Sequence, residues 1–218
     1  GAGRISVNGR IIATPDHWVD AERDEVCLDG QPIVAQERVY VLLYKPTGYI
    51  TSYKDPENRP TVYDLIDKVG TWVSPVGRLD LDTSGLLILT NDNQFADCVM
   101  NPEGKVPKTY LIKTNSILTE ESITKLRNGI DLSDGPTRRA TVVHLRDSAS
   151  STFLEITITE GRNRQVRRMV EAVGSRVRKL VRTAIGSVQI KDLPIGHWRM
   201  LTAQEIRSLS PGKKNSGT

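Results

Sequence analysis

A short stretch of the sequence, GRLDLDTSGLLILTND, places reactive side chains directly before an apolar run. Arg78, Asp80 and Asp82 alternate with leucines, and residues 83–85, Thr-Ser-Gly, follow them. Two carboxylates at this spacing can ligate a metal ion, cap a turn or provide a single nucleophile. The residues on either side of the pair distinguish these three kinds of chemistry.

The metal interpretation rests on residues 80–83, which fit the DxDxT pattern and resemble the aspartate-dependent phosphotransferases at these four positions. In that family the aspartates directly follow a hydrophobic strand and emerge at its C-terminal end. Here the residues before the aspartates are Ser-Pro-Val-Gly-Arg, and the hydrophobic run comes after them. The order of the elements is therefore the reverse of the one that this metal site requires.

Residues 82–85 favour a turn, because Asp, Ser and Thr side chains can bond to nearby backbone amides. This gives Asp82 a structural role but leaves Asp80 unexplained. A nucleophilic carboxylate must be ionised and desolvated without being coordinated, and a neighbouring guanidinium keeps it charged. Arg78 and the basic segment later in the chain can each supply that guanidinium.

Positive charge is concentrated in residues 160–182, although the net charge of the whole chain is only +4. This segment holds eight Lys and Arg residues against two Glu, whereas residues 1–40 hold four Lys and Arg against seven Asp and Glu. A concentrated basic segment is typical of a protein that binds a polyanion, and a solvated helix face is the alternative.

Helical spacing separates the side chains of the basic segment into faces. One face is apolar and the other is charged. The apolar face comprises Val166, Met169, Val170 and Val173, and the opposite face comprises Arg164, Arg168 and Glu171. Arg167 falls at the border, so its head group can be partly buried against an acidic partner. The pattern indicates that one arginine pairs with a carboxylate and that several others are available to bind phosphates.

The composition, with 38% hydrophobic and 26% charged residues in 218, is that of a folded chain long enough for a sizeable core. Cys27 and Cys98 are far apart and have no CxxC pair or nearby His, which predicts reduced thiols of a cytosolic protein. Apolar runs such as Leu86–Leu89 are too short to cross a bilayer, and no charged-then-apolar leader opens the chain. We therefore expect a cytoplasmic protein without membrane contact.

The predicted elements mix strands and helices without strict alternation. Residues 5–12 read as a hairpin around Asn8-Gly9, and residues 31–38 as a linker. The expected strands are 39–45, 86–90, 108–114, 141–145, 152–159, 176–182 and 186–190, and the expected helices are 61–69, 92–100, 119–128, 163–173 and 202–209. This pattern predicts an α+β fold with a central mixed, largely antiparallel sheet flanked by helices.

Three segments in this order, GRLDLDTSGLLILT, PKTYLI and EGRNRQVRRM, resemble the signature motifs of pseudouridine synthases. The segments YKPTGYITS and GRNRQVRRM resemble, more narrowly, the small-subunit-type branch of bacterial ribosomal RNA pseudouridine synthases. The resemblance extends from about Val39 to Leu209. It implies the catalytic fold of that family, with a cleft, and isomerisation of specific uridines in ribosomal RNA to pseudouridine without a metal or another cofactor.

The resemblance also implies roles for single residues. Asp80 matches the catalytic aspartate, Tyr110 the tyrosine that stacks on the target base, and Arg167 the arginine that pairs with the catalytic carboxylate. Arg78 matches the arginine that holds the rearranged RNA, and Lys45 is a candidate for phosphate contact. The basic segment, including Arg162 and Arg164, is expected to bind the RNA backbone.

The implied reaction cleaves the bond between uracil and ribose, rotates the base and rejoins it through carbon 5. Asp80 attacks either the base or the sugar carbon, or promotes a glycal-like elimination, and the sequence leaves these routes open. The target base must leave its stack, at a cost of a few kcal/mol in a duplex, and stacking on Tyr110 offsets about 1–3 kcal/mol of this cost. The phenol can also take part in proton transfer at carbon 5.

The start of the chain, with RISVNG, VD and LDG, resembles the last part of the α-L-type RNA-binding module. We therefore expect residues 1–35 to be a remnant of that module plus a linker, residues 36–210 the catalytic domain, and residues 211–218 a flexible tail. The expected partner is ribosomal RNA or a pre-ribosomal particle, and the expected state is a monomer. A non-catalytic RNA-binding or ribosome-assembly factor with the same fold is the alternative function.

Overall fold

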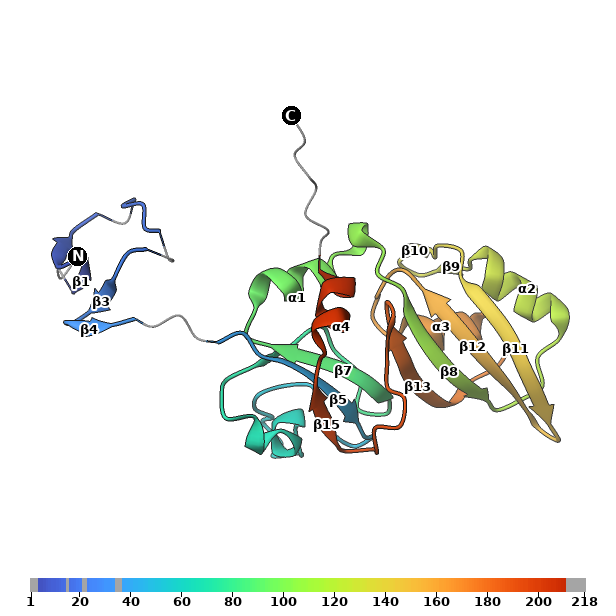
Figure 1. Ribbon diagram of the computed structural model, residues 1–218. Coiled ribbons are helices and arrows are strands. Elements are labelled where there is room, and N and C mark those ends of the chain that lie inside the picture. Colours follow the sequence, from blue (N-terminus) through green and yellow to red (C-terminus); the bar gives the residue numbers. More distant parts are fainter. Residues whose placement is uncertain (1–3, 15, 21–22, 34–36, 211–218) are drawn as a thin grey trace. The chain divides into compact units, whose positions relative to one another are not determined.

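The computed structural model describes residues 4–14, 16–20, 23–33 and 37–210 and separates into two compact units, Gly1–Arg38 and Val39–Thr218 (Figure 1). The expected tail, residues 211–218, lies outside the described residues. None of the helices in the described part is both long and apolar enough to cross a membrane.

The first unit is a small antiparallel sheet with the strand order β2-β1-β3-β4. Its strands are β1 (Ile5–Val7), β2 (Arg10–Ile12), β3 (Val26–Leu28) and β4 (Gln31–Pro32). Asn8 and Gly9 both have positive φ angles, 50° and 78°, and form the predicted hairpin turn between β1 and β2. The prediction of a linker from residue 31 is wrong at its start, because a second positive-φ pair, Asp29-Gly30, folds β4 back onto β3.

The second unit is built on a nine-stranded sheet with the order β11-β12-β8-β13-β7-β5-β15, to which β6 and β14 add at β7 and β13. The strands are β5 (Tyr40–Lys45), β6 (Ser74–Pro75), β7 (Ser84–Thr90), β8 (Lys108–Thr114), β11 (Thr141–Ser148), β12 (Ser151–Ile158), β13 (Val177–Ile185), β14 (Val188–Gln189) and β15 (Trp198–Met200). A separate hairpin pairs β9 (Asp131–Leu132) with β10 (Gly135–Pro136). The β13–β7 pair is parallel and the other pairs are antiparallel, which confirms the predicted mixed α+β architecture.

Side-chain caps set the start of three of the four α-helices that the described residues form. The helices are α1 (Asn93–Met100), α2 (Glu120–Asn128), α3 (Gln165–Ala172) and α4 (Ala203–Leu209). Asp92, Thr119 and Thr202 each accept a hydrogen bond from a backbone amide of the first turn. The predicted helix over 61–69 is instead two 3₁₀ turns, η1 (Val62–Leu65) and η2 (Asp67–Val69), and a third, η3 (Pro102–Gly104), follows α1.

The central strands are buried on both faces, which explains their continuous apolar sequences. Leu42, Leu86 and Ile88 pack with the helices α1 and α4, which lie beside β7 (Figure 1). Alternate residues of the same strands, such as Leu43 and Leu87, pack with η1 on the other face. A third cluster packs β8 and β12 against α2 and α3.

Strand β13 joins the two halves of the sheet. Leu180 packs in the cluster of α2 and α3, whereas the next residue, Val181, packs in the cluster of α1 and α4. The parallel pairing with β7 brings Arg182 opposite Gly85, which has a φ of +123°. A Cβ atom at position 85 would clash with the backbone N, C and O atoms of Arg182. Glycine is therefore required where these strands meet.

We expect Gly85→Ala to lower the free energy of unfolding by more than about 3 kcal/mol, because neither the clash with a central strand nor the φ angle can relax locally. Gly70→Ala is the matched control: its φ is +78° but its Cβ would meet open space, so we expect a loss of about 1–2 kcal/mol. Urea unfolding measures both. Equal losses for the two variants would contradict the close approach of β7 and β13.

Candidate active site

A cleft of about 490 Å³ brings together most of the predicted site residues. It is lined by the loop before β7, the start of β8, the segment before α3 and the middle of β13. Five predicted residues line it, namely Arg78, Asp80, Tyr110, Arg162 and Arg164. Lys45 and Arg167 do not line it.

The loop that carries Asp80 is fastened by backbone hydrogen bonds and by the segment after β5. The amide of Thr83 donates to the Asp80 carbonyl at 3.1 Å and closes a turn. The amide of Gly48 donates to the Leu81 carbonyl at 2.8 Å, and the Thr51 hydroxyl donates to the Leu79 carbonyl at 2.9 Å. The Asp80 side chain keeps 34% of its surface exposed and faces the cleft.

Lys45 lies behind this loop and not in the cleft. It has no exposed surface, and its Nζ donates to the carbonyls of Pro46, Asp80 and Thr83 at 3.0, 3.1 and 2.9 Å. Burial lowers the pKa of Lys45 to about 8, although the charges of Asp80 and Asp82 act in the opposite direction. The predicted phosphate contact therefore needs correction: Lys45 is a positioning residue that fixes the backbone beneath Asp80.

Arg167 also supports the loop, which corrects the predicted pair with Asp80. Its Nη2 donates to the Asp82 carbonyl at 2.9 Å and to the Thr83 hydroxyl at 3.2 Å, and it lies 3.2 Å from the Asp82 carboxylate. The guanidinium is buried, as its border position on α3 predicts.

Arg164 is the arginine that reaches Asp80, with its Nη1 3.4 Å from Oδ2. It also donates to both carboxylate oxygens of Asp82, at 3.2 and 3.3 Å. Its φ of 47° makes it the residue before α3 and not part of the helix, so the helix begins two residues later than predicted. This left-handed conformation, which the sequence pattern does not reveal, determines which arginine reaches Asp80.

Asp82 serves as an ionic anchor for the two arginines. Desolvation raises the pKa of its carboxyl, but the hydrogen bond from Arg164 and the charge of Arg167 outweigh it, and the pKa lies below its usual range. The turn that Asp82 was predicted to build is closed instead by the backbone of Thr83 and Asp80.

Arg162 is held by acidic residues and by a hairpin. It lies 3.3 Å from the Glu160 carboxylate and 3.5 Å from that of Asp134, and it donates to the Gly135 carbonyl at 2.8 Å. Arg168 binds both carboxylate oxygens of Asp134, at 2.8 and 2.9 Å. The two arginines thus tie the β9–β10 hairpin to the segment before α3.

Two further residues line the cleft: Lys108, which was not predicted as a site residue, and Arg182, which was predicted only as a member of the basic segment 160–182. Both adjoin Tyr110, because Lys108 precedes it by two positions on β8 and Arg182 pairs with it across the ladder. Only 9% of the surface of Tyr110 is exposed, and the residue packs in one cluster with Ile112 and Val166. The alternation of β8 would have placed Lys108 on the face of Tyr110, which is the signal that the sequence analysis did not use.

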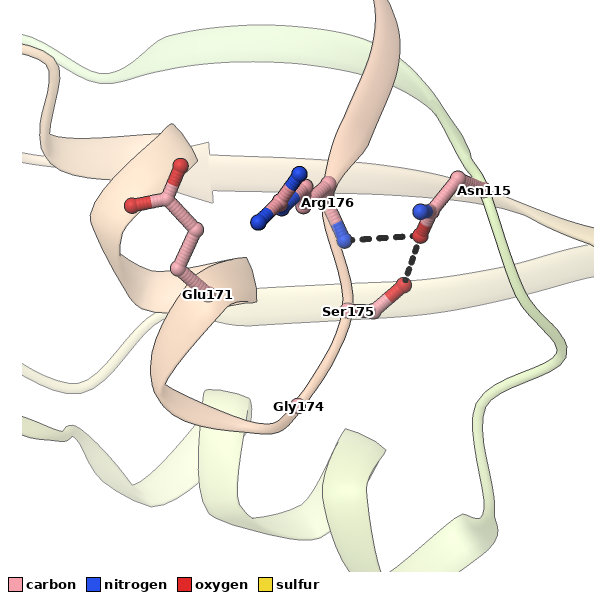
Figure 2. A pocket seen from close by; sticks show the side chains of 5 residues that line it. All are labelled: Asn115, Glu171, Gly174, Ser175 and Arg176. Atoms are coloured by element: carbon pink, nitrogen blue, oxygen red, sulfur yellow. Dashed lines mark hydrogen bonds between the residues drawn. The ribbon is translucent and has the colours of Figure 1, made fainter.

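A second hollow, of about 670 Å³, lies at the end of α3 and contains none of the predicted site residues. Figure 2 shows that Asn115 accepts hydrogen bonds there from the Ser175 hydroxyl at 3.0 Å and the Arg176 amide at 2.9 Å. Glu171 and Gly174 complete its lining. These bonds connect the segment after β8 to the segment after α3. The polar groups of the hollow therefore have a structural role, and we assign the hollow no function.

No group of three or more His, Cys, Asp or Glu side chains arranged to hold a metal ion is found among the residues that the structure describes.

Comparison with known proteins identifies relatives that match 95% of the chain. The family model described as RNA pseudouridylate synthase matches residues 39–172. "Ribosomal large subunit pseudouridine synthase B" of Bacillus subtilis (strain 168) is 39% identical over 95% of this chain and 85% of its own length. An RNA pseudouridine synthase of Aquifex aeolicus (strain VF5) is 38% identical over 95% of this chain and 84% of its own length.

A solved structure described as "Crystal structure of pseudouridylate synthase" superposes with a TM-score of 0.74 at 32% identity, covering 95% of this chain and 89% of the other. The fold thus has a solved counterpart of nearly the same length.

We expect the buried charge of Lys45 to make stability depend on pH. Because its pKa is about 8 when folded and 10.5 ordinarily, the unfolded chain holds this proton more tightly between these values. The contribution is therefore present above pH 10.5 and is lost as the pH falls through 8. Relative to Lys45→Met, the free energy of unfolding of the wild type should rise by up to about 3 kcal/mol across this window.

Urea unfolding at several pH values measures this difference. Lys125→Met, which removes a lysine from the exposed face of α2, controls for the loss of one positive charge. A difference between wild type and Lys45→Met that stays constant from pH 7 to 10.5 would contradict a buried, desolvated ammonium at this position.

Proposed function

Because the chain belongs to the RNA pseudouridylate synthase family, we propose that it isomerises specific uridines of ribosomal RNA with Asp80 as the catalytic residue. The observation that carries this proposal is the Asp80 carboxylate, which faces a cleft lined by Tyr110 and has Arg164 at 3.4 Å. The geometry supplies one carboxylate, one aromatic ring and a compensating guanidinium. These are the groups that base isomerisation needs.

We further propose RNA of the large ribosomal subunit as the substrate, free or in a pre-ribosomal particle. The name of the Bacillus subtilis relative, which matches this chain over 95% of its length, supports the large subunit. We also propose that the chain groups by sequence with the small-subunit-type branch, whose motifs it resembles. A ribosomal RNA substrate implies a cytoplasmic enzyme, and we propose that it acts as a monomer.

The reaction breaks the bond between uracil N1 and ribose C1′ and forms a bond between C5 and C1′, while a proton leaves C5 and N1 regains one. A carboxylate is consumed in none of the three routes, so Asp80 can act repeatedly. Its loop is fastened on both sides, which holds the carboxylate in place while the base rotates. No redox partner or group donor enters this balance.

Tyr110 is the proposed stacking surface for the extruded uracil. Its buried position on a central strand keeps the ring fixed, and base–aromatic stacking is worth about 1–3 kcal/mol. The phenol oxygen is a candidate for accepting the C5 proton. Arg78 lines the cleft, is exposed, and makes no ion pair with a described residue, which supports its proposed role in holding rearranged RNA.

We propose that the first unit is a remnant of the α-L-type module that its sequence resembles, and we assign the RNA backbone contacts to the second unit, because residues 1–40 hold seven Asp and Glu against four Lys and Arg. Its sheet is held by short hairpins and by side-chain bonds such as that of Asn8 to Asp24 at 2.8 Å. Arg162 and Arg164 are proposed to meet the RNA backbone at the edge of the cleft, where each keeps surface exposed beside its acidic partner.

We expect Asp80→Asn to abolish tritium release from large-subunit ribosomal RNA labelled at C5 of uridine, while RNA affinity stays within about 3-fold of wild type, because a neutral amide cannot act as the nucleophile. Asp82→Asn is the matched control: it should slow release but keep it measurable, since Asp80 remains. Filter binding and thermal unfolding accompany the rate measurement.

Tritium release by Asp80→Asn would assign the chemistry to another group. A wild type that binds ribosomal RNA but releases no tritium from any of it would favour the non-catalytic RNA-binding factor. Release that a chelator abolishes would favour the metal-dependent alternative.

A further inference from the structure

The cationic side chains of the cleft fall into two sets. Those that line it are Arg78, Lys108, Arg162, Arg164 and Arg182. Arg162 and Arg164 form ion pairs with carboxylates. Lys108 and Arg182 form none with any described residue, although they lie deeper than the exposed Arg78. Arg162 and Arg164 are thus already neutralised by carboxylates, and the two cations on the strands, Lys108 and Arg182, are not.

Arg182 is a buried guanidinium with unused donors. Only 4% of the residue is exposed, its Nε donates to the Leu86 carbonyl at 2.7 Å, and its Nη2 is buried without a hydrogen-bond partner among the described residues. A buried donor without an acceptor is costly, and a charged one more so. The close approach of Gly85 fixes the backbone at this position, so the side chain is held toward the cleft.

Lys108 adds a second cation to the same corner. Its Nζ donates only to the Val106 carbonyl, at 3.3 Å. Desolvation, and next the nearby charge of Arg182, lower the pKa of Lys108. Two like charges that are partly desolvated and that repel each other are stabilised when an anion binds between them.

We propose that Lys108 and Arg182 form a phosphate-binding site inside the cleft, which holds a phosphodiester of the RNA beside the nucleotide stacked on Tyr110. Tyr110 adjoins both cations, because Lys108 precedes it by two positions on β8 and Arg182 is its partner on β13, so an anion bound by both cations adjoins the ring. Arginine offers paired N–H donors to phosphate oxygens and lysine a point charge. The inference rests on the proposed function, since phosphodiesters are the anions that an RNA substrate brings.

The test compares Lys108→Met, Arg182→Gln and Arg182→Lys with wild type in single-turnover tritium release from C5-labelled large-subunit ribosomal RNA, at several salt concentrations. Lys113→Met is the matched control, because Lys113 lies on the same strand but packs over the Phe153 ring and does not line the cleft. Thermal unfolding establishes that each variant is folded. Arg182→Lys retains the charge should Arg182→Gln fail to fold.

We expect Lys108→Met and Arg182→Gln to raise the half-saturating enzyme concentration roughly 10-fold to 100-fold. Their salt dependence should become shallower, by about 0.7 in the logarithmic slope for each lost contact. Arg182→Lys should weaken binding but keep the slope, and Lys113→Met should match wild type. Folded variants with unchanged affinity, or with weaker binding and an unchanged slope for Lys108→Met, would overturn the phosphate site. Absence of release by wild type would instead overturn the proposed function.

Discussion

The loop that carries Asp80 is held through its backbone carbonyls by two buried cations. Lys45 donates to the carbonyls of Asp80 and Thr83, and Arg167 donates to that of Asp82. Moving a charge out of water costs several kcal/mol, and carbonyl dipoles recover only part of that cost. Such an arrangement favours a fixed position over stability, because three backbone carbonyls of one turn, those of Asp80, Asp82 and Thr83, are held by groups that do not line the cleft.

The same arrangement determines the charge distribution on the two sides of the loop. Behind it, Lys45 and Arg167 face carbonyl oxygens, and in front of it Arg164 bridges the carboxylates of Asp80 and Asp82. Most of the contacts that Arg164 and Arg167 make with this loop are to Asp82. The Asp80 carboxylate has one long contact, to Arg164. A carboxylate with one partner at 3.4 Å is more available to a substrate than one with several short bonds.

Strong local signals made most of the fold predictable. Strand β8 has the predicted bounds, because its residues alternate regularly, and helix α2 begins one residue after its predicted start, because Thr119 is its cap and a glycine follows its end. Strands of two or three residues, such as β6, β9, β10 and β15, carry no period of their own and exist only through their partners. They could not have been read from the sequence.

The sequence predicted five of the residues that line the cleft, but it did not predict how the charged side chains pair. The buried Lys45 follows Val41 and Leu43 at alternate positions, so the strand pattern indicated a buried face, yet lysine rarely occupies one. The exchange of roles between Arg164 and Arg167 depends on one left-handed residue, and such a conformation is rare for a side chain with a Cβ. Pairings of this kind follow from a single backbone angle, which composition and periodicity do not contain.

Strand β13 connects the two parts of the cleft and thereby fixes their separation. Its pairing with β7, the strand that directly follows the Asp80 loop, is parallel. Its pairing with β8, which carries Tyr110, is antiparallel. Strand β13 also contributes Leu180 to the cluster that contains Tyr110 and Val181 to the cluster that contains Leu86 of β7. Because packed cores resist small displacements, the distance between the Asp80 loop and Tyr110 is set by two ladders of hydrogen bonds.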